Sequence, residues 1–152
     1  MTRLILLLAL MPAVAIAAPQ AQMQMTSTVQ VEKTVTVAGK PQTQLKAPDS
    51  VVPGDKLVLA TAYRNATAKP VDGFVVTNPV PKGVEYAGGA SAGAQLSVDG
   101  GRQWGSLGTL RVTQPDGTSR AAAGGDVTTV RWTIARVAPG AAGSVSYRGI
   151  VR

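Results

Sequence analysis

Carboxylates have the widest scope for chemistry in this sequence, because the chain contains neither histidine nor cysteine. A glycosidase needs two carboxylates that face each other across a cleft. Five of the aspartates instead stand beside glycine, proline or serine, which is typical of turns. We therefore predict turn capping and no catalytic residues. The carboxylates are Glu32, Asp49, Asp55, Asp72, Glu85, Asp99, Asp116 and Asp126.

Other reaction chemistries lack their residue patterns. No D-x-D-x-D-G calcium loop occurs, and neither G-x-S-x-G nor S-x-x-K marks a nucleophilic serine. We predict no cofactor and no metal site. One alternative stays open, in which Asp49 and Asp55 share a loop-bound calcium ion instead of capping their turns.

One short motif has a recognisable form. Residues 97–104, SVDGGRQW, fit the Asp-box pattern S-x-D-x-G-x-x-W, which recurs in sialidases and other propellers away from their active sites. In such a turn Asp99 accepts backbone N–H bonds, Gly101 takes a positive φ and Trp104 packs beneath. A single copy predicts a structural hairpin turning at residues 99–101 and not a glycan-processing site.

The few aromatic residues have two alternative roles. They could line a carbohydrate platform, but Trp132 and Tyr147 alternate with valines, which favours a place in the core. The aromatic residues considered are Tyr63, Tyr86, Trp104, Trp132 and Tyr147. Asn65-Ala66-Thr67 is a formal glycosylation sequon, and we interpret it as a loop by its composition.

The net charge of +7 raises the question of an anionic partner. The basic residues are scattered, nowhere three together, and aromatics for stacking on single strands are few. We therefore predict no nucleic-acid binding. Weak attraction to an anionic envelope polymer is a remaining alternative.

The first residues have the form of a secretory signal. Arg3 supplies a positive charge, an apolar stretch follows and Pro12 breaks it, and Ala15-Ile16-Ala17 offers a cleavage site. A membrane anchor is the alternative, but about 15 apolar residues fall short of the ~20 that span a bilayer. We predict a signal peptide over 1–17, a flexible lead-in over 18–28, a periplasmic or extracellular address, and no stable membrane insertion after cleavage.

The elements that must position these residues are strands. In 29–37 the valines at 29, 31, 35 and 37 share one face, and only Lys33 interrupts the apolar series. Residues 56–65, the region around 74–76, 128–137 and 144–152 alternate or run apolar in the same way, with proline and glycine turns between them. The pattern predicts an all-β sandwich of about seven or eight antiparallel strands over 29–152.

Two passages resemble a known family. In residues 50–89 a Pro-Gly-Asp turn feeds an apolar strand that ends in asparagine, and Asn78-Pro79-Val80-Pro81 and Tyr86 follow. In residues 130–152 an Ala-Pro-Gly turn precedes the last strand. This is similar to the bacterial surface-repeat domain called domain of unknown function eleven, here in a single copy with Asn78 where aspartate is frequent. The resemblance implies an immunoglobulin-like β-sandwich in an exported protein, and it implies no catalytic residue.

These observations together predict an exported, non-catalytic module with a binding or assembly role at the bacterial cell envelope. Its partner would be a protein or an anionic envelope polymer. The alternatives are a structural spacer of a secreted assembly and, less favoured, a carboxylate-based or metal-dependent hydrolase.

Overall fold

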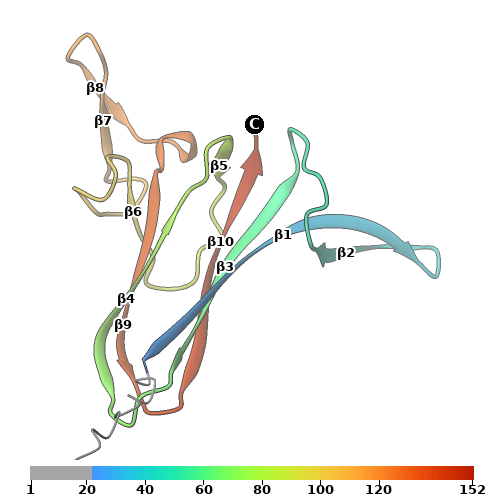
Figure 1. Cartoon of the computed structure of the whole chain (residues 1–152). Coiled ribbons are helices and arrows are strands. Elements are labelled where there is room, and N and C mark those ends of the chain that lie inside the picture. Colours follow the sequence, from blue (N-terminus) through green and yellow to red (C-terminus); the bar gives the residue numbers. More distant parts are fainter. Residues whose placement is uncertain (1–21) are drawn as a thin grey trace, which may run out of the picture.

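The structure, a computed structural model, describes residues 22–152 and is all-β (Figure 1). This part of the chain has ten strands, so the expected number of seven or eight is wrong. The only helical segment between residues 22 and 152 is a three-residue 3-10 turn, too short to cross a membrane. The predicted signal peptide lies outside the described residues. The elements are β1 Met23–Val37, β2 Lys40–Lys46, β3 Lys56–Asn65, β4 Val71–Pro79, β5 Val84–Tyr86, β6 Gln95–Ser97, β7 Arg111–Thr113, β8 Ser119–Ala121, η1 Gly124–Asp126, β9 Thr129–Val137 and β10 Ala142–Val151.

The strands form three antiparallel sheets. Five strands pair in the order β2-β1-β3-β10-β5, three in the order β4-β9-β6, and β7 with β8 makes a separate hairpin. The last strand, β10, therefore lies inside the larger sheet between β3 and β5. In an immunoglobulin constant-type domain the last strand instead ends the smaller sheet.

The core lies between the two larger sheets and follows from the alternation in their strands. Val130 and Trp132 of β9 meet Val145 and Tyr147 of β10, and Val76 of β4 joins them. Each of these side chains is almost fully buried. The predicted inward faces of 128–137 and 144–152 are thus confirmed at Val130 and Val145, as is the core placement of Trp132 and Tyr147.

Polar side chains also tie the two sheets together. The Thr61 hydroxyl of β3 donates to Asn78 Oδ1 of β4 at 2.9 Å, and Ser27 Oγ of β1 lies 2.9 Å from the same hydroxyl oxygen. The Tyr147 hydroxyl donates to the carbonyl of Pro79 at 3.1 Å. These contacts place β4 over β3 and β10.

The beginning of β1 corrects the predicted lead-in. Residues 23–28, expected to be flexible, are strand and pair with residues 60–65 of β3. The low-complexity composition concealed this strand because its pairing uses backbone groups, which every residue but proline supplies. Most of its side chains are exposed, so no apolar alternation was needed.

Beyond Lys33, β1 leaves the body and continues with β2 as a two-stranded arm, which Figure 1 shows projecting to one side. We call residues 33–46 the arm. All seven residues of β2 are exposed, and the sequence analysis missed this strand. Ala38 and Gly39 turn the chain with φ values of 50° and 79°, the conformation of a two-residue hairpin turn.

A candidate binding surface at the base of the arm

Two consecutive residues of β1 fasten the arm to the body. Glu32 Oε1 accepts a hydrogen bond from Arg148 Nε of β10 at 2.9 Å, and Lys33 Nζ donates to Asp55 Oδ1 at 2.7 Å. Neighbouring residues of a strand point to opposite faces. The arm is therefore held by an ion pair on each side of the sheet at the point where it leaves the core.

Asp55 is fully engaged in this attachment. Its second oxygen accepts the backbone N–H of Val52 at 3.1 Å, so one carboxylate closes the turn and holds Lys33. The hydrogen bond from Lys33, and after it the one from Val52, lowers the pKa of Asp55. No three acidic or other metal-ligating side chains lie together within residues 22–152. In this arrangement Asp55 neutralises a lysine and caps its turn, while Asp49 lines the groove and the hollow next to it.

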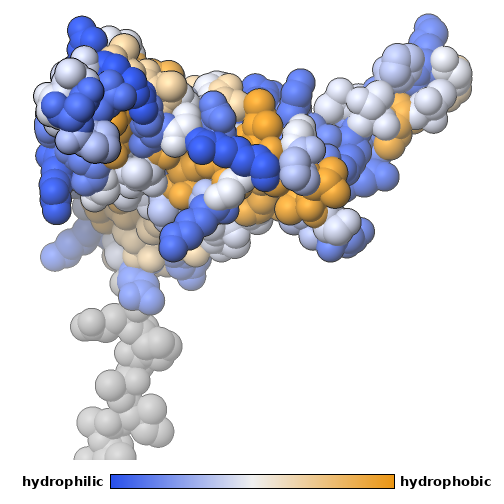
Figure 2. All heavy atoms as spheres, turned by 90° about the horizontal axis from the view of Figure 1, so that it is seen from above, coloured by the Kyte–Doolittle hydropathy of each residue, from blue (hydrophilic) through white to orange (hydrophobic). Residues whose placement is uncertain are grey.

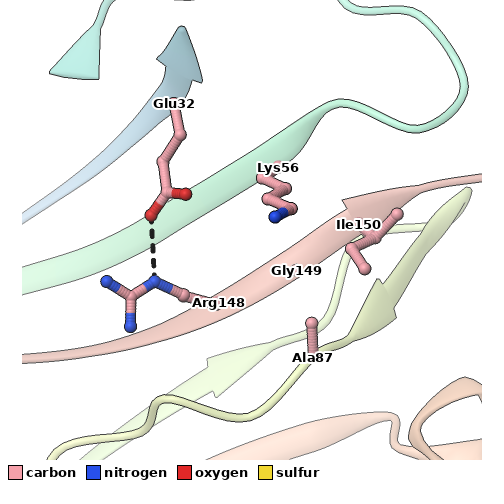
Figure 3. A pocket seen from close by; sticks show the side chains of 6 residues that line it. All are labelled: Glu32, Lys56, Ala87, Arg148, Gly149 and Ile150. Atoms are coloured by element: carbon pink, nitrogen blue, oxygen red, sulfur yellow. Dashed lines mark hydrogen bonds and ion pairs between the residues drawn. The ribbon is translucent and has the colours of Figure 1, made fainter. Parts of the chain in front are cut away.

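A polar depression lies on the outer face of the five-stranded sheet, at the arm's base (Figure 3). It measures about 350 Å³ and contains the Glu32–Arg148 pair beside Lys56. Ala87, Gly149 and Ile150 complete its lining. With one carboxylate and two cations, it lacks the facing carboxylate pair of a glycosidase and is suited to holding anionic groups.

The inner face of the same sheet carries an apolar groove of about 420 Å³. It exists because β4 covers β3 and not β1, which leaves Met25 and Val29 about half exposed. Leu57 and Leu59 form its buried floor. Figure 2, looking down on the molecule, shows hydrophobic residues gathered between the body and the arm. The remaining lining residues are Val29, Pro48, Asp49, Ser50, Val51, Pro81 and Val84.

Lysines lie beside this groove. A smaller hollow of about 180 Å³ adjoins it through Asp49 and Ser50, and Lys33 and Lys46 line that hollow. Lys82 directly follows the lining residue Pro81. Asp49 is the only carboxylate that lines either depression. The surface thus combines an apolar floor with Lys46, which has no ion-pair partner among the described residues, beside the paired Lys33 and the carboxylate of Asp49.

No family model, curated protein or solved structure matches this chain. The fold and this surface must therefore carry any functional argument.

The Asp box has the structure that its pattern predicts. Asp99 Oδ1 accepts the Ser97 hydroxyl at 2.8 Å and the backbone N–H groups of Arg102 and Gln103 at 3.0 Å. The bond from Gln103, followed by that from Ser97, lowers the pKa of Asp99. Gly101 has a φ of 95°, and a β-carbon there would stand 3.1 Å from the Trp104 ring. All three of these hydrogen bonds lie within the turn, so the predicted turn-forming role of Asp99 is confirmed.

The other carboxylates are dispersed. Asp72, Glu85 and Asp126 each pair with an arginine, namely Arg136, Arg152 and Arg120. Asp116 accepts the backbone N–H and the hydroxyl of Thr118. Among the described residues, none of the three depressions at the arm's base contains two carboxylates.

The aromatic residues do not form one platform. Tyr86 and Trp132 flank Tyr147 in the interior with ring centres 6.0 and 6.5 Å from it, and Tyr63 packs on Phe74. Trp104 is separate from them and stacks under the Arg131 guanidinium at 4.0 Å. The five aromatic residues that could have formed a sugar-binding platform therefore do not share one continuous face.

Asn65, the sequon residue, is fully buried at the end of β3. Its amide nitrogen donates to the carbonyls of Lys69 and Val137, and its oxygen accepts from Thr67. A glycan cannot attach to this nitrogen in the folded protein. Asn65 ends β3, as the predicted strand 56–65 requires, and the expected loop follows it at residues 66–70; its role as a buried anchor is what the sequence did not show.

The groove and the arm were the features that sequence reasoning missed. The stretch 48–55 was interpreted only as turn chemistry, although Val51 and Val52 within it are exposed. Two adjacent valines in a proline–glycine turn were the one available signal, since the turn itself needs no apolar side chain.

Proposed function

We propose that this chain is an exported, non-catalytic β-sandwich module that binds or assembles with a partner at the bacterial cell envelope. The observation that carries the proposal is the arm. It extends beyond the core, its strand β2 forms the edge of the five-stranded sheet, and every residue of β2 is exposed.

The arm is expected to have little stability of its own, because it packs against no core. An isolated two-stranded hairpin is marginally stable in water, and an open edge of unpaired backbone groups is a template for another strand. Val37 and Leu45 on the arm are also half exposed. A partner that adds a strand to β2 would satisfy its backbone and cover these side chains.

The fold and its resemblance add support of a broader kind. Two antiparallel sheets around one core fit the immunoglobulin-like sandwich in architecture, although the place of β10 departs from the constant-type order. We propose kinship with the bacterial surface-repeat domain named above on the motifs in 50–89 and 130–152. The signal-like residues 1–17 favour a periplasmic or extracellular address.

The alternatives have weaker support. A structural spacer would explain the sandwich but not an arm with an open edge. A carboxylate-based or metal-dependent hydrolase would need clustered carboxylates, and every carboxylate of the described chain except Asp49 is engaged separately in a turn or an ion pair. A protein partner is therefore preferred, and an anionic envelope polymer is second.

Site-specific photocrosslinking tests the role of the arm. A photoreactive amino acid replaces Thr43 on β2, and a matched variant carries it at Thr113 on β7, an equally exposed strand residue. In envelope extracts at physiological and high salt, we expect discrete crosslinked species from position 43 only. Equal crosslinking from both positions, or none from either, would contradict the proposal.

Shortening the arm gives the complementary test. Replacing residues 34–45 with an Asn-Gly turn should abolish capture of the crosslinked species while cooperative unfolding persists, because these residues lie outside the core. Capture that persists without the arm would show that another surface binds the partner.

A further inference from the structure

We propose that the groove beside the arm binds an extended acidic peptide segment whose alternate residues are apolar. This inference rests on the proposed function and assigns its partner a chemistry. The observation behind it is the juxtaposition, on one side of the sheet, of an apolar floor and neighbouring lysines.

The floor sets the first requirement on the ligand. Val29, Leu57 and Leu59 come from two neighbouring strands of the sheet, and Pro81 and Val84 close the opposite side. A volume of about 420 Å³ lies in the range of roughly 300–1,000 Å³ typical of ligand sites. Water in such a groove gains few hydrogen bonds from its walls, so displacement of this water by apolar side chains is favourable.

The charges set the second requirement. Lys33 and Lys46 line the adjoining hollow, and Lys33 is already paired with Asp55. Lys46 has no carboxylate among the described residues that pairs with it. The chain as a whole carries +7. A second copy of the chain would bring like charges together, whereas an acidic segment is attracted and its charges meet the lysines.

The sheet sets the third requirement. The groove lies against Val29 of β1 and against Leu57 and Leu59 of β3, and the unpaired edge of β2 is part of the same sheet. An extended segment presents side chains alternately to opposite sides. It can therefore place apolar side chains on the floor and acidic ones toward the lysines and solvent.

Binding of short labelled peptides to the full-length chain tests the inference by fluorescence anisotropy. The probe alternates glutamate with leucine. Two matched peptides replace either the leucines with serine or the glutamates with lysine. We expect the first peptide to bind at least about tenfold more tightly than either control. Equal affinity of the serine peptide would indicate a general anionic-polymer surface and overturn the inference, as would equal affinity of the lysine peptide.

Variants of the protein locate the binding. Val29→Asp alters the groove, and Val75→Asp is its control, since the two valines are 41% and 47% exposed and Val75 lies on the outer face of β4. Lys46→Glu at the rim has Lys40→Glu at the arm's tip as its control. We expect each groove variant to weaken binding about tenfold and each control to leave it unchanged.

The failure of this inference is distinguishable from that of the proposed function. No peptide binding, or equal effects of Val29→Asp and Val75→Asp, would overturn the groove assignment even where Thr43 crosslinks a partner. If Thr43 gave no crosslinked species while the peptide still bound in a manner that depends on Val29, the proposed role of the arm would be contradicted. The assignment of the groove as a peptide site would still stand.

Discussion

Asn65 makes four side-chain hydrogen bonds from a position with no exposed surface. The bonds join the end of β3 to the loop before β4 and to the end of β9. Its backbone adds the connection to β10, because Asn65 N–H donates to the carbonyl of Ala141 and its own carbonyl accepts from Gly140. Asn65 thus ties the end of β3 to the loop before β4, to the end of β9 and to the turn before β10 at one end of the sandwich.

Replacing Asn65 with alanine should lower the free energy of unfolding by about 3 kcal/mol, because several buried backbone groups lose their partner at once. Urea denaturation measures the change. Gln44→Ala, which removes an exposed amide from β2, is the control and should stay within about 0.5 kcal/mol. A loss of less than about 1 kcal/mol at Asn65 would show that the hydrogen bonds are replaced by water.

Single residues differ in how far their roles could be predicted. The Asp box specifies its own turn, since all partners of Asp99 lie within four positions of it. Asn65 was correctly expected to end its strand, but its anchoring role could not be predicted, because one of its partners, Val137, is 72 positions away. Hydrogen bonds between residues close in the sequence can be predicted from the spacing of the residues. Hydrogen bonds between residues far apart in the sequence cannot.

Among the strands, those with buried side chains could be predicted from the sequence, and the exposed ones could not. Strands β3, β9 and β10 carry core side chains and were predicted with nearly their observed bounds. Strand β2 contacts no core and contains proline, glutamine and lysine, so its sequence has no apolar alternation. Lys33 did carry information, because the break it makes in the valine series marks where β1 leaves the body.

The arm's direction depends on the Lys33–Asp55 pair, and acid should release it. Because the folded pKa of Asp55 lies below its ordinary value of 3.8, the pair stabilises the attachment above that pH, and the contribution is lost as pH falls through the lower folded value. Spin labels on cysteines at Gln42 and Thr133, in a chain without other cysteines, report the arm-to-body distance.

We expect a narrow distance distribution at pH 7 that broadens at strongly acidic pH, and Asp55→Asn should broaden it already at pH 7. Asp116→Asn makes the same chemical change in a turn away from the arm and should have no effect. An arm that keeps its distance in Asp55→Asn would mean that backbone pairing with β3 and the Glu32–Arg148 pair suffice to direct it.

At the scale of the whole molecule, Tyr147 connects the two sheets by packing and by a hydrogen bond to Pro79. Burial raises the pKa of Tyr147 to about 12 from 10.0. The unfolded chain therefore releases this proton at a lower pH than the folded chain. The resulting stabilisation is complete below pH 10 and is lost as pH rises toward the folded value.

Tyr147→Phe should lower stability at pH 7 by about 1 kcal/mol through loss of the hydrogen bond. It should also make the decline of stability between pH 10 and 12 shallower, because one titrating group is removed. Urea midpoints measured across this pH range for both proteins give the two slopes. Parallel curves would show that Tyr147 titrates alike in the folded and unfolded chains.

The position of β10 has a consequence for how the chain acquires its shape. Strands β3 and β5 both pair with β10, yet both precede it along the chain. A growing polypeptide that has not reached Ala142 leaves these strands without their shared neighbour, and most of the closing contacts join distant positions, which makes assembly slow. Completion of the sheet therefore waits until residues 142–151 have been synthesised, and until then the edges of β3 and β5 that face β10 stay open.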